Sequence, residues 1–283
     1  MSIDIPIIEM GKEIPKMIFQ THTQAYNKLP KIFKENINSI KEMNPEHQYV
    51  YFDSNMRKKF ILNTYGENML KIYNLVNKNY GAARADFFRY LLMYAKGGIY
   101  IDLKSTFTRP LKIKPGTKYI LSHWFGFDSI FPEFINNPYL MKYGEFQQWN
   151  IITVKGHPFL RKVIERIVHN VLNYNILIQS VAKRGVLRVT GPIAYSIPID
   201  NIKHNYDYLL SKNIEQDFGI KYSIFDNMAH ENHVSNKHYS KLVTPIVYPH
   251  RVKDYINLMI FYPLKISKNI FKIIMNKLIS RNY

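Results

Sequence analysis

The feature that most constrains the fold is a helical pattern that ends on two glycines and continues at once as an apolar strand. Residues 82–96, AARADFFRYLLMYAK, carry apolar side chains at helical spacing. Gly97 is placed to cap the C-terminus of that helix, and Gly98 eases the turn into a strand predicted over residues 99–103. The length and regularity of this unit predict a packed domain in which helices cover a sheet.

Polar side chains gather near the end of this strand. Alternate strand residues point to opposite faces, so Tyr100, Asp102 and Lys104 are expected on one side of it. On the preceding helix Asp86 and Arg89 are three residues apart and therefore neighbours on one face. Helix and strand together are expected to bring Asp86, Arg89 and Asp102 to the same sheet edge. A simple intrahelical ion pair is the alternative for Asp86 and Arg89.

The rest of the chain extends the α/β pattern. Strands are predicted at residues 16–22 and 47–53, and helices over 29–45 and 56–79. Further helices are predicted at 156–172 and from 192 onward, with short strands at 187–190, 221–226 and 242–248. No repeat or low-complexity tract marks a boundary. Residues 1–254 are therefore expected to form one domain, and residues 255–283 a basic, apolar helical segment.

Charge and cysteine content limit the function classes. The 283 residues hold 39 Lys and Arg against 21 Asp and Glu, a formal net charge of +18, so an anionic partner is expected. Nucleic acid, phospholipid and nucleoside diphosphates all qualify. The lysines are scattered and no zinc-finger or RNA-binding motif is present, which argues against nucleic acid. The lack of cysteine excludes disulfides, thiol catalysis and cysteine-ligated metals.

The two ends of the chain bear on location. Residues 1–16 contain acids and a proline and make a poor signal peptide, and no segment reaches the roughly 20 apolar residues that span a bilayer. The expected location is the cytoplasm or the cytoplasmic face of a membrane. After Pro263, isoleucines fall on one side of a predicted helix and lysines elsewhere. That helix either lies on an anionic membrane or docks its isoleucines on the domain.

Three segments resemble a known family when they are taken in order. IPKMIFQTH, NPEHQYVYFD and ARADFFRYLLMYAKGGIYIDLKS are similar to the sugar-binding region of DXD-motif glycosyltransferases, glycosyltransferase family 32. The resemblance implies a GT-A glycosyltransferase fold, with a Rossmann-like central mixed sheet and helical additions. It also implies transfer of a hexose, with retention, from a UDP- or GDP-sugar to a hydroxyl of a glycan, a lipid-linked sugar or a protein.

The resemblance also assigns residues. It implies that Asp86 and Arg89 hold the donor sugar, and that Asp102 is the first carboxylate of the DXD motif. The donor-binding set that it implies is Phe19, Gln20, Thr21, His22, Tyr100, His238, Tyr239 and Ser240. For Tyr100 plain aromatic packing is the alternative, and His22 alternatively just ends a strand.

The sharpest departure from the family pattern is Lys104, which stands where the second carboxylate belongs. Three interpretations of Lys104 stay open. Lys104 replaces the metal as a fixed cation, or Mn²⁺ or Mg²⁺ is held by Asp102 and other groups, or the protein binds a sugar nucleotide without turnover.

A polar segment near residue 230 contains three histidines, His230, His233 and His238. Their irregular spacing argues against zinc. The resemblance instead implies a loop that closes over the diphosphate, with His238, Tyr239 and Ser240 as the contacting residues.

Overall fold

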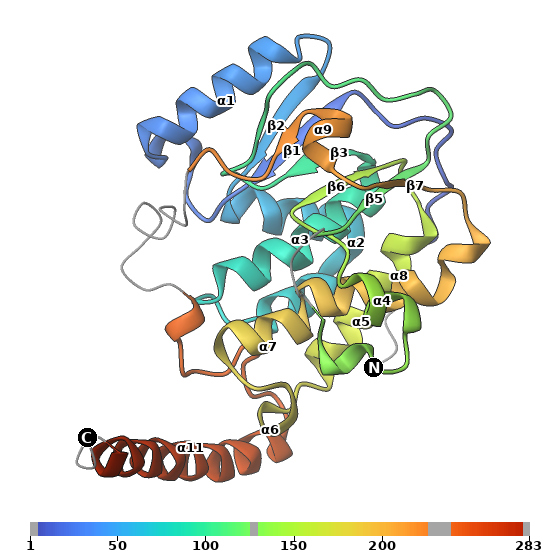
Figure 1. The fold of residues 1–283 in the computed structure, drawn as a ribbon. Helices are drawn as coiled ribbons and strands as arrows, with labels where there is room; N and C mark the ends of the chain where they lie inside the picture. The colour runs from blue at the N-terminus through green and yellow to red at the C-terminus, as the bar shows by residue number, and fades with distance from the viewer. Residues whose placement is uncertain (1–4, 125–129, 226–238, 280–283) are drawn as a thin grey trace.

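The computed structural model describes residues 5–124, 130–225 and 239–279, and for residues 268–279 it describes the backbone. At its centre is a six-stranded mixed sheet in the order β2-β1-β3-β6-β5-β7 (Figure 1). Its strands are β1 (Met17–Thr21), β2 (Gln48–Phe52), β3 (Gly98–Ile101), β5 (Tyr119–Ser122), β6 (Asn150–Thr153) and β7 (Leu209–Ser211). Strand β1 runs parallel to β2 and β3, and β7 parallel to β5, whereas β6 is antiparallel to both of its neighbours. A second, two-stranded sheet pairs β4 (Thr106–Phe107) with β8 (Ile220–Lys221).

Helices cover both faces of the central sheet (Figure 1). They are α1 (Lys31–Met43), α2 (Ser54–Leu75), α3 (Gly81–Lys96), α4 (Pro138–Tyr143), α5 (Pro158–Leu172), α6 (Ile176–Gln179), α7 (Ala182–Val189), α8 (Pro192–Ile202), α9 (Ile214–Phe218) and α11 (Val252–Ile279). None of the helices in the described ranges has the length and hydropathy of a membrane span. The predicted α/β class, with a mixed central sheet and helical additions, is confirmed.

The period of two along the strands divides the core into layers. Phe19 and Tyr100 belong to the large cluster formed with α2, α3, α5, α7 and α8. Ile18, Ile99 and Ile101 belong to a second cluster, with residues of α1 and α9. Strand β3 is therefore buried on both faces, and its polar continuation emerges only at its end.

The α3-to-β3 turn has the form that the sequence predicts. Helix α3 ends at Lys96, and Gly97 caps it with φ 66° and ψ −165°, a combination that only glycine adopts readily. A Cβ atom at Gly97 would lie 2.8 Å from the carbonyl carbon of Val154. Glycine is needed here because β6 passes so close.

Several element predictions were wrong in detail. Strand β3 stops at Ile101 rather than residue 103, because a turn follows in which the Ser105 amide donates to the Asp102 carbonyl. Helix α2 is broken at Gly66. Residues 187–190 are mostly helix α7 rather than a strand, residues 242–248 make a single bridge at Val247, and the strand expected from 221 ends at Lys221.

Candidate active site

An ion-pair cluster lies at the end of β3, where the sequence predicts it. The Arg89 guanidinium on α3 contacts two carboxylates: its Nη2 is 3.0 Å from Asp86 Oδ1 and 3.1 Å from Asp102 Oδ1. The side chains of Asp86 and Arg89 are each only 5% exposed, whereas that of Asp102 is 26% exposed. One carboxylate is therefore reachable from solvent, and the other two groups lie behind it.

Other elements hold the cluster in place. Arg89 Nη1 donates to the Gln148 carbonyl at 2.8 Å, and the Tyr100 ring lies under the guanidinium, 4.8 Å from its carbon. The Tyr100 hydroxyl donates to Asp102 Oδ1 at 3.1 Å. Thr190, just before α8, donates to Asp86 Oδ2 at 3.2 Å. The contacts of Arg89 thus extend well beyond an intrahelical pair.

Burial sets the electrostatics of Asp86. It raises the pKa of the Asp86 carboxyl to about 6, and Arg89 opposes this shift. Asp86 is therefore still an anion near neutral pH, and is able to accept hydrogen bonds from sugar hydroxyls.

Strand β1 supports the cluster mainly through buried side chains that pack in the core or bond to the backbone. Phe19 is core, and Gln20 is fully buried, donating from Nε2 to the Asp102 carbonyl at 2.9 Å. Thr21 donates to the Phe52 carbonyl at 2.7 Å. His22 follows the strand, and burial and Arg57 lower its pKa to about 4, so it is neutral.

Lys104 lies near Asp102 and is covered by an aromatic group made of Tyr222 and Trp149. Its Nζ is 2.6 Å from the Tyr222 hydroxyl and 3.8 Å from the centre of that ring. Burial lowers the pKa of Lys104, and Asp102 works against this shift. Trp149 contacts the same tyrosine, with ring centres 5.1 Å apart. Lys104 is thus held against Tyr222 and partly buried rather than extended into bulk water.

Glu145 is a buried carboxylate beside this aromatic group, and the sequence patterns did not single it out. It is 8% exposed, and its Oε2 has no hydrogen-bond partner among the described residues. Burial raises the pKa of Glu145 to about 8, despite nearby Lys183 and a hydrogen bond with Trp124. Burial and, to a smaller extent, the carboxylates of Asp102 and Glu145 raise the pKa of Tyr222 to about 12, so Glu145 is a neighbour of this tyrosine.

The expected C-terminal loop is only partly described. His230, His233 and His238 lie outside the described residues. Tyr239 and Ser240 begin a short 3₁₀ helix, Tyr239–Lys241, and Tyr239 packs against the large core cluster. Their predicted role at the diphosphate stays a prediction.

A divalent cation is compatible with part of this site. Mg²⁺ bound to a diphosphate keeps several waters and needs only one or two protein carboxylates. Asp102 fits that role, because its carboxylate is partly exposed at the end of β3. In the described part of the chain, no three His, Asp or Glu side chains gather as a complete metal site.

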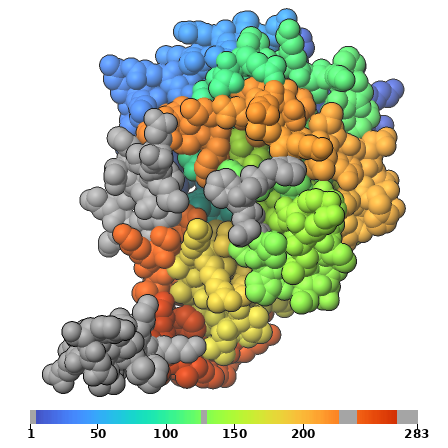
Figure 2. Space-filling view, in the orientation of Figure 1, coloured from blue at the N-terminus to red at the C-terminus, as the bar shows by residue number. Residues whose placement is uncertain are grey.

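Figure 2 shows a hollow between the orange segment and the yellow helices, with atoms of the teal part of the chain, to which α3 belongs, visible in it.

Four residues near the cluster were missed by the sequence patterns, and all come from the second half of the chain: Gln148, Thr190, Tyr222 and Glu145. A weak signal existed for two of them. Gln148 belongs to a polar run before β6, and Thr190 precedes the Gly-Pro start of α8.

Known proteins resemble this chain in sequence and in fold. Residues 30–123 match the family model described as the glycosyltransferase sugar-binding region containing a DXD motif. The initiation-specific alpha-1,6-mannosyltransferase of Schizosaccharomyces pombe is 26% identical over 64% of this chain and 46% of its own length. Inositol phosphoceramide mannosyltransferase 3 of the same yeast is 30% identical over 65% of this chain and 44% of its own. The chain therefore spans less than half the length of these curated relatives.

Among solved structures, the PaToxG glycosyltransferase is similar over 69% of this chain and 71% of its own, at 15% identity and a TM-score of 0.49. The matched region 30–123 contains Asp86, Arg89 and Asp102, the cluster at the end of β3. The part of the chain that holds this cluster therefore matches the family model of glycosyltransferase sugar-binding regions containing a DXD motif.

Proposed function

We propose that the protein transfers a hexose from a nucleoside diphosphate sugar to a hydroxyl group, with mannose as the first sugar to test. The observation that carries the proposal is the Asp86–Arg89–Asp102 cluster, which lies within the family match and opens to solvent through Asp102. Mannose comes first because curated relatives are named mannosyltransferases.

In this proposal each member of the cluster has one task. Asp86 accepts hydrogen bonds from sugar hydroxyls, and Arg89 holds both carboxylates in place and adds positive charge next to the leaving diphosphate. Asp102 binds the donor directly, and would also hold a divalent cation if one accompanies the diphosphate. Lys104 supplies a positive charge where the family motif has a second carboxylate. Fixed charges of this kind stabilise the transition state more than the ground state.

The acceptor is proposed more coarsely, as a hydroxyl of a glycan or of a glycolipid headgroup. One S. pombe relative carries the name inositol phosphoceramide mannosyltransferase, which favours testing a phosphoinositol lipid beside a mannan oligosaccharide. Retention of the anomeric configuration is part of the proposal, and NMR of the first-formed product would test it.

The test is a thermal-shift and hydrolysis experiment with GDP-mannose, UDP-glucose and UDP-galactose. A donor that binds the folded state raises the melting temperature, and slow transfer to water releases nucleoside diphosphate. Asp86→Asn is the diagnostic variant because it keeps the size and the Thr190 contact, and we expect about a hundredfold loss of release. Glu35→Gln, an exposed carboxylate on α1, is the control. Binding of none of the three donors, or full activity of Asp86→Asn, would contradict the proposal.

The position of Lys104 also supports a second candidate, a sugar-nucleotide-binding protein without turnover. Lys104 removes one of the two carboxylates that the family pattern expects. The same experiment separates the two functions. A donor that raises the melting temperature, but is neither hydrolysed nor transferred to any acceptor, would establish binding alone.

A further inference from the structure

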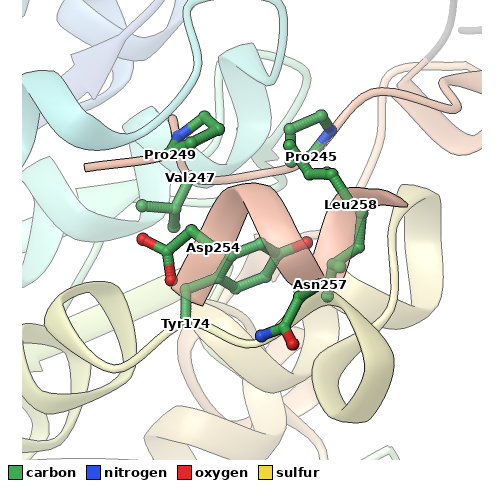
Figure 3. A pocket seen from close by; sticks show the side chains of 8 residues that line it. Tyr174, Pro245, Val247, Pro249, Asp254, Asn257 and Leu258 are labelled. Atoms are coloured by element: carbon green, nitrogen blue, oxygen red, sulfur yellow. The ribbon is translucent and has the colours of Figure 1, made fainter. Parts of the chain in front are cut away.

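Helix α11 contacts the body of the molecule along its first three turns, as far as Tyr262, and then extends beyond it (Figure 1). At the anchor, Arg251 Nη2 is 2.6 Å from Asp254 Oδ1 and donates to the Tyr174 carbonyl at 2.7 Å. A small hollow beside this anchor is lined by Tyr174, Val247 and Leu258 (Figure 3). Because α11 itself supplies part of the wall, the hollow belongs to the anchor of the helix.

The outward side of α11 is apolar and exposed. Val252, Ile256, Met259 and Ile266 are 80%, 52%, 75% and 59% exposed. Their spacing of four, three and seven residues places them along one line of an α-helix. In the sequence the same spacing continues at Ile270. Of the two alternatives that the sequence left open, docking of the isoleucines on the domain is therefore wrong for Ile266.

Beyond Asp254, whose carboxylate pairs with Arg251, the charges that accompany this stripe have one sign. From residue 255 to the last residue of the sequence there is no Asp or Glu. The same stretch contains Lys265, Lys268, Lys272, Lys277 and Arg281. The stripe therefore belongs to a segment that is both apolar and uniformly basic.

We propose that α11 docks on an anionic lipid membrane, with its apolar stripe in the headgroup region and its lysines near lipid phosphates. An interfacial helix needs an apolar face together with attraction to anionic lipid, and α11 has both. A second copy of the chain is a poorer partner for this face, because two basic helices repel each other. The inference does not depend on the proposed sugar transfer.

The experiment is sedimentation of the full chain with vesicles of phosphatidylcholine, alone or mixed with phosphatidylglycerol. One variant removes apolar contact (Ile256→Ser with Met259→Ser), and a second removes charge (Lys265→Gln, Lys268→Gln and Lys272→Gln). Matched controls lie outside α11. They are Ile135→Ser with Ile178→Ser, which are 73% and 70% exposed, and a triple exchange of the exposed Lys12, Lys58 and Lys59 to Gln.

We expect the wild type to sediment with the mixed vesicles, to lose binding at high salt and to ignore phosphatidylcholine alone. Each α11 variant should bind at least about tenfold more weakly, and each control should bind like the wild type. The proposal is overturned if the wild type stays in solution with mixed vesicles, or if α11 variants bind unchanged. It is also overturned if the lysine control loses as much binding as the α11 lysine variant. A change from dimer to monomer in the Ile256, Met259 variant, with vesicle binding unaltered, would identify a second copy as the occupant instead.

Discussion

Arg89 links helix α3 to the end of strand β3 through ion pairs with Asp86 and Asp102. It contacts one carboxylate on its own helix and one just beyond the strand, with its Nη2 3.0 Å from Asp86 Oδ1 and 3.1 Å from Asp102 Oδ1. Removing the guanidinium would leave a buried Asp86 without its cation, and breaking such a pair costs about 3–5 kcal/mol. Arg89→Ala is therefore expected to lower stability as well as activity. For this reason Asp86→Asn is the cleaner test of function.

Lys104 gives a prediction about metal dependence. An ammonium about 4 Å from a phosphate oxygen gains roughly 4 kcal/mol of gross attraction at an effective dielectric near 20, before desolvation. We expect donor binding to survive EDTA, Lys104→Ala to weaken nucleoside diphosphate binding, and Lys104→Asp to make activity depend on Mn²⁺ or Mg²⁺. Tyr222→Phe is the matched variant, since it keeps the ring next to Lys104 and removes only the hydroxyl contact. If EDTA abolishes wild-type activity and Lys104→Ala does not change it, the metal rather than Lys104 neutralises the diphosphate.

Glu145 gives a prediction about pH. Its pKa is raised from 4.5 to about 8 by burial, so between these values the folded state holds a proton that the unfolded state has lost. Stability must then fall as pH rises through this window, by up to about 1.4 kcal/mol per pH unit. Glu145→Gln removes the effect, so its free energy of unfolding relative to the wild type should increase from pH 5 to pH 8. Urea titrations at several pH values measure this difference, and parallel curves for the two proteins would show that Glu145 does not titrate as its burial implies.

At the scale of the elements, two glycines with the same backbone strain provide a matched pair. Gly97 and Gly66 have φ values of 66° and 78° with extended ψ, a region that costs other residues about 1–3 kcal/mol. A Cβ atom at Gly97 would also meet the Thr153 carbonyl oxygen at 2.9 Å, whereas at Gly66 nothing lies within 4 Å. Gly97→Ala should therefore be clearly more destabilising than Gly66→Ala in urea unfolding. Equal losses would mean that β6 moves aside without cost.

The active-site residues show which contacts local sequence patterns can predict and which they cannot. The proximity of Asp86, Arg89 and Asp102 could be predicted from the sequence. The helix period makes Asp86 and Arg89 neighbours, and Asp102 follows the strand that comes directly after that helix. Other contacts to this cluster or to Lys104 come from Gln148, Thr190 and Tyr222, which are 59, 104 and 118 residues away in the sequence. A helix or strand period cannot predict contacts over such separations.

Helix α7 shows how tertiary packing overrides a local preference. The β-branched residues near its end favour a strand by type. However, Val186 and Val189 are both buried in the large core cluster, and their spacing of three residues suits one face of a helix. The core therefore decides the structure of this segment.

At the scale of the whole molecule, the C-terminal segment divides into an anchor and a projecting part. The expected boundary at residue 254 falls inside α11, because the helix already begins at Val252. The anchor belongs with the body, since the Asp254 side chain is only 9% exposed and Arg251 reaches carbonyls of Leu172 and Tyr174. Beyond the anchor, the apolar side chains of α11 include several that face solvent.

This division leads to a prediction about truncation. Deleting residues 267–283 removes only the projecting part, so the urea midpoint and the affinity for donor should both match the wild type. Deleting residues 252–283 also removes Asp254 and Leu258, which leaves Arg251 without its carboxylate and uncovers Val247. The lost contacts together should cost about 2–4 kcal/mol, since burying one apolar side chain is worth about 1.5–3 kcal/mol and a partly exposed ion pair up to about 1 kcal/mol. Circular dichroism during urea unfolding separates the two proteins. If the shorter deletion destabilises the chain as much as the longer one, the end of α11 is part of the core, and the membrane proposal loses its exposed helix.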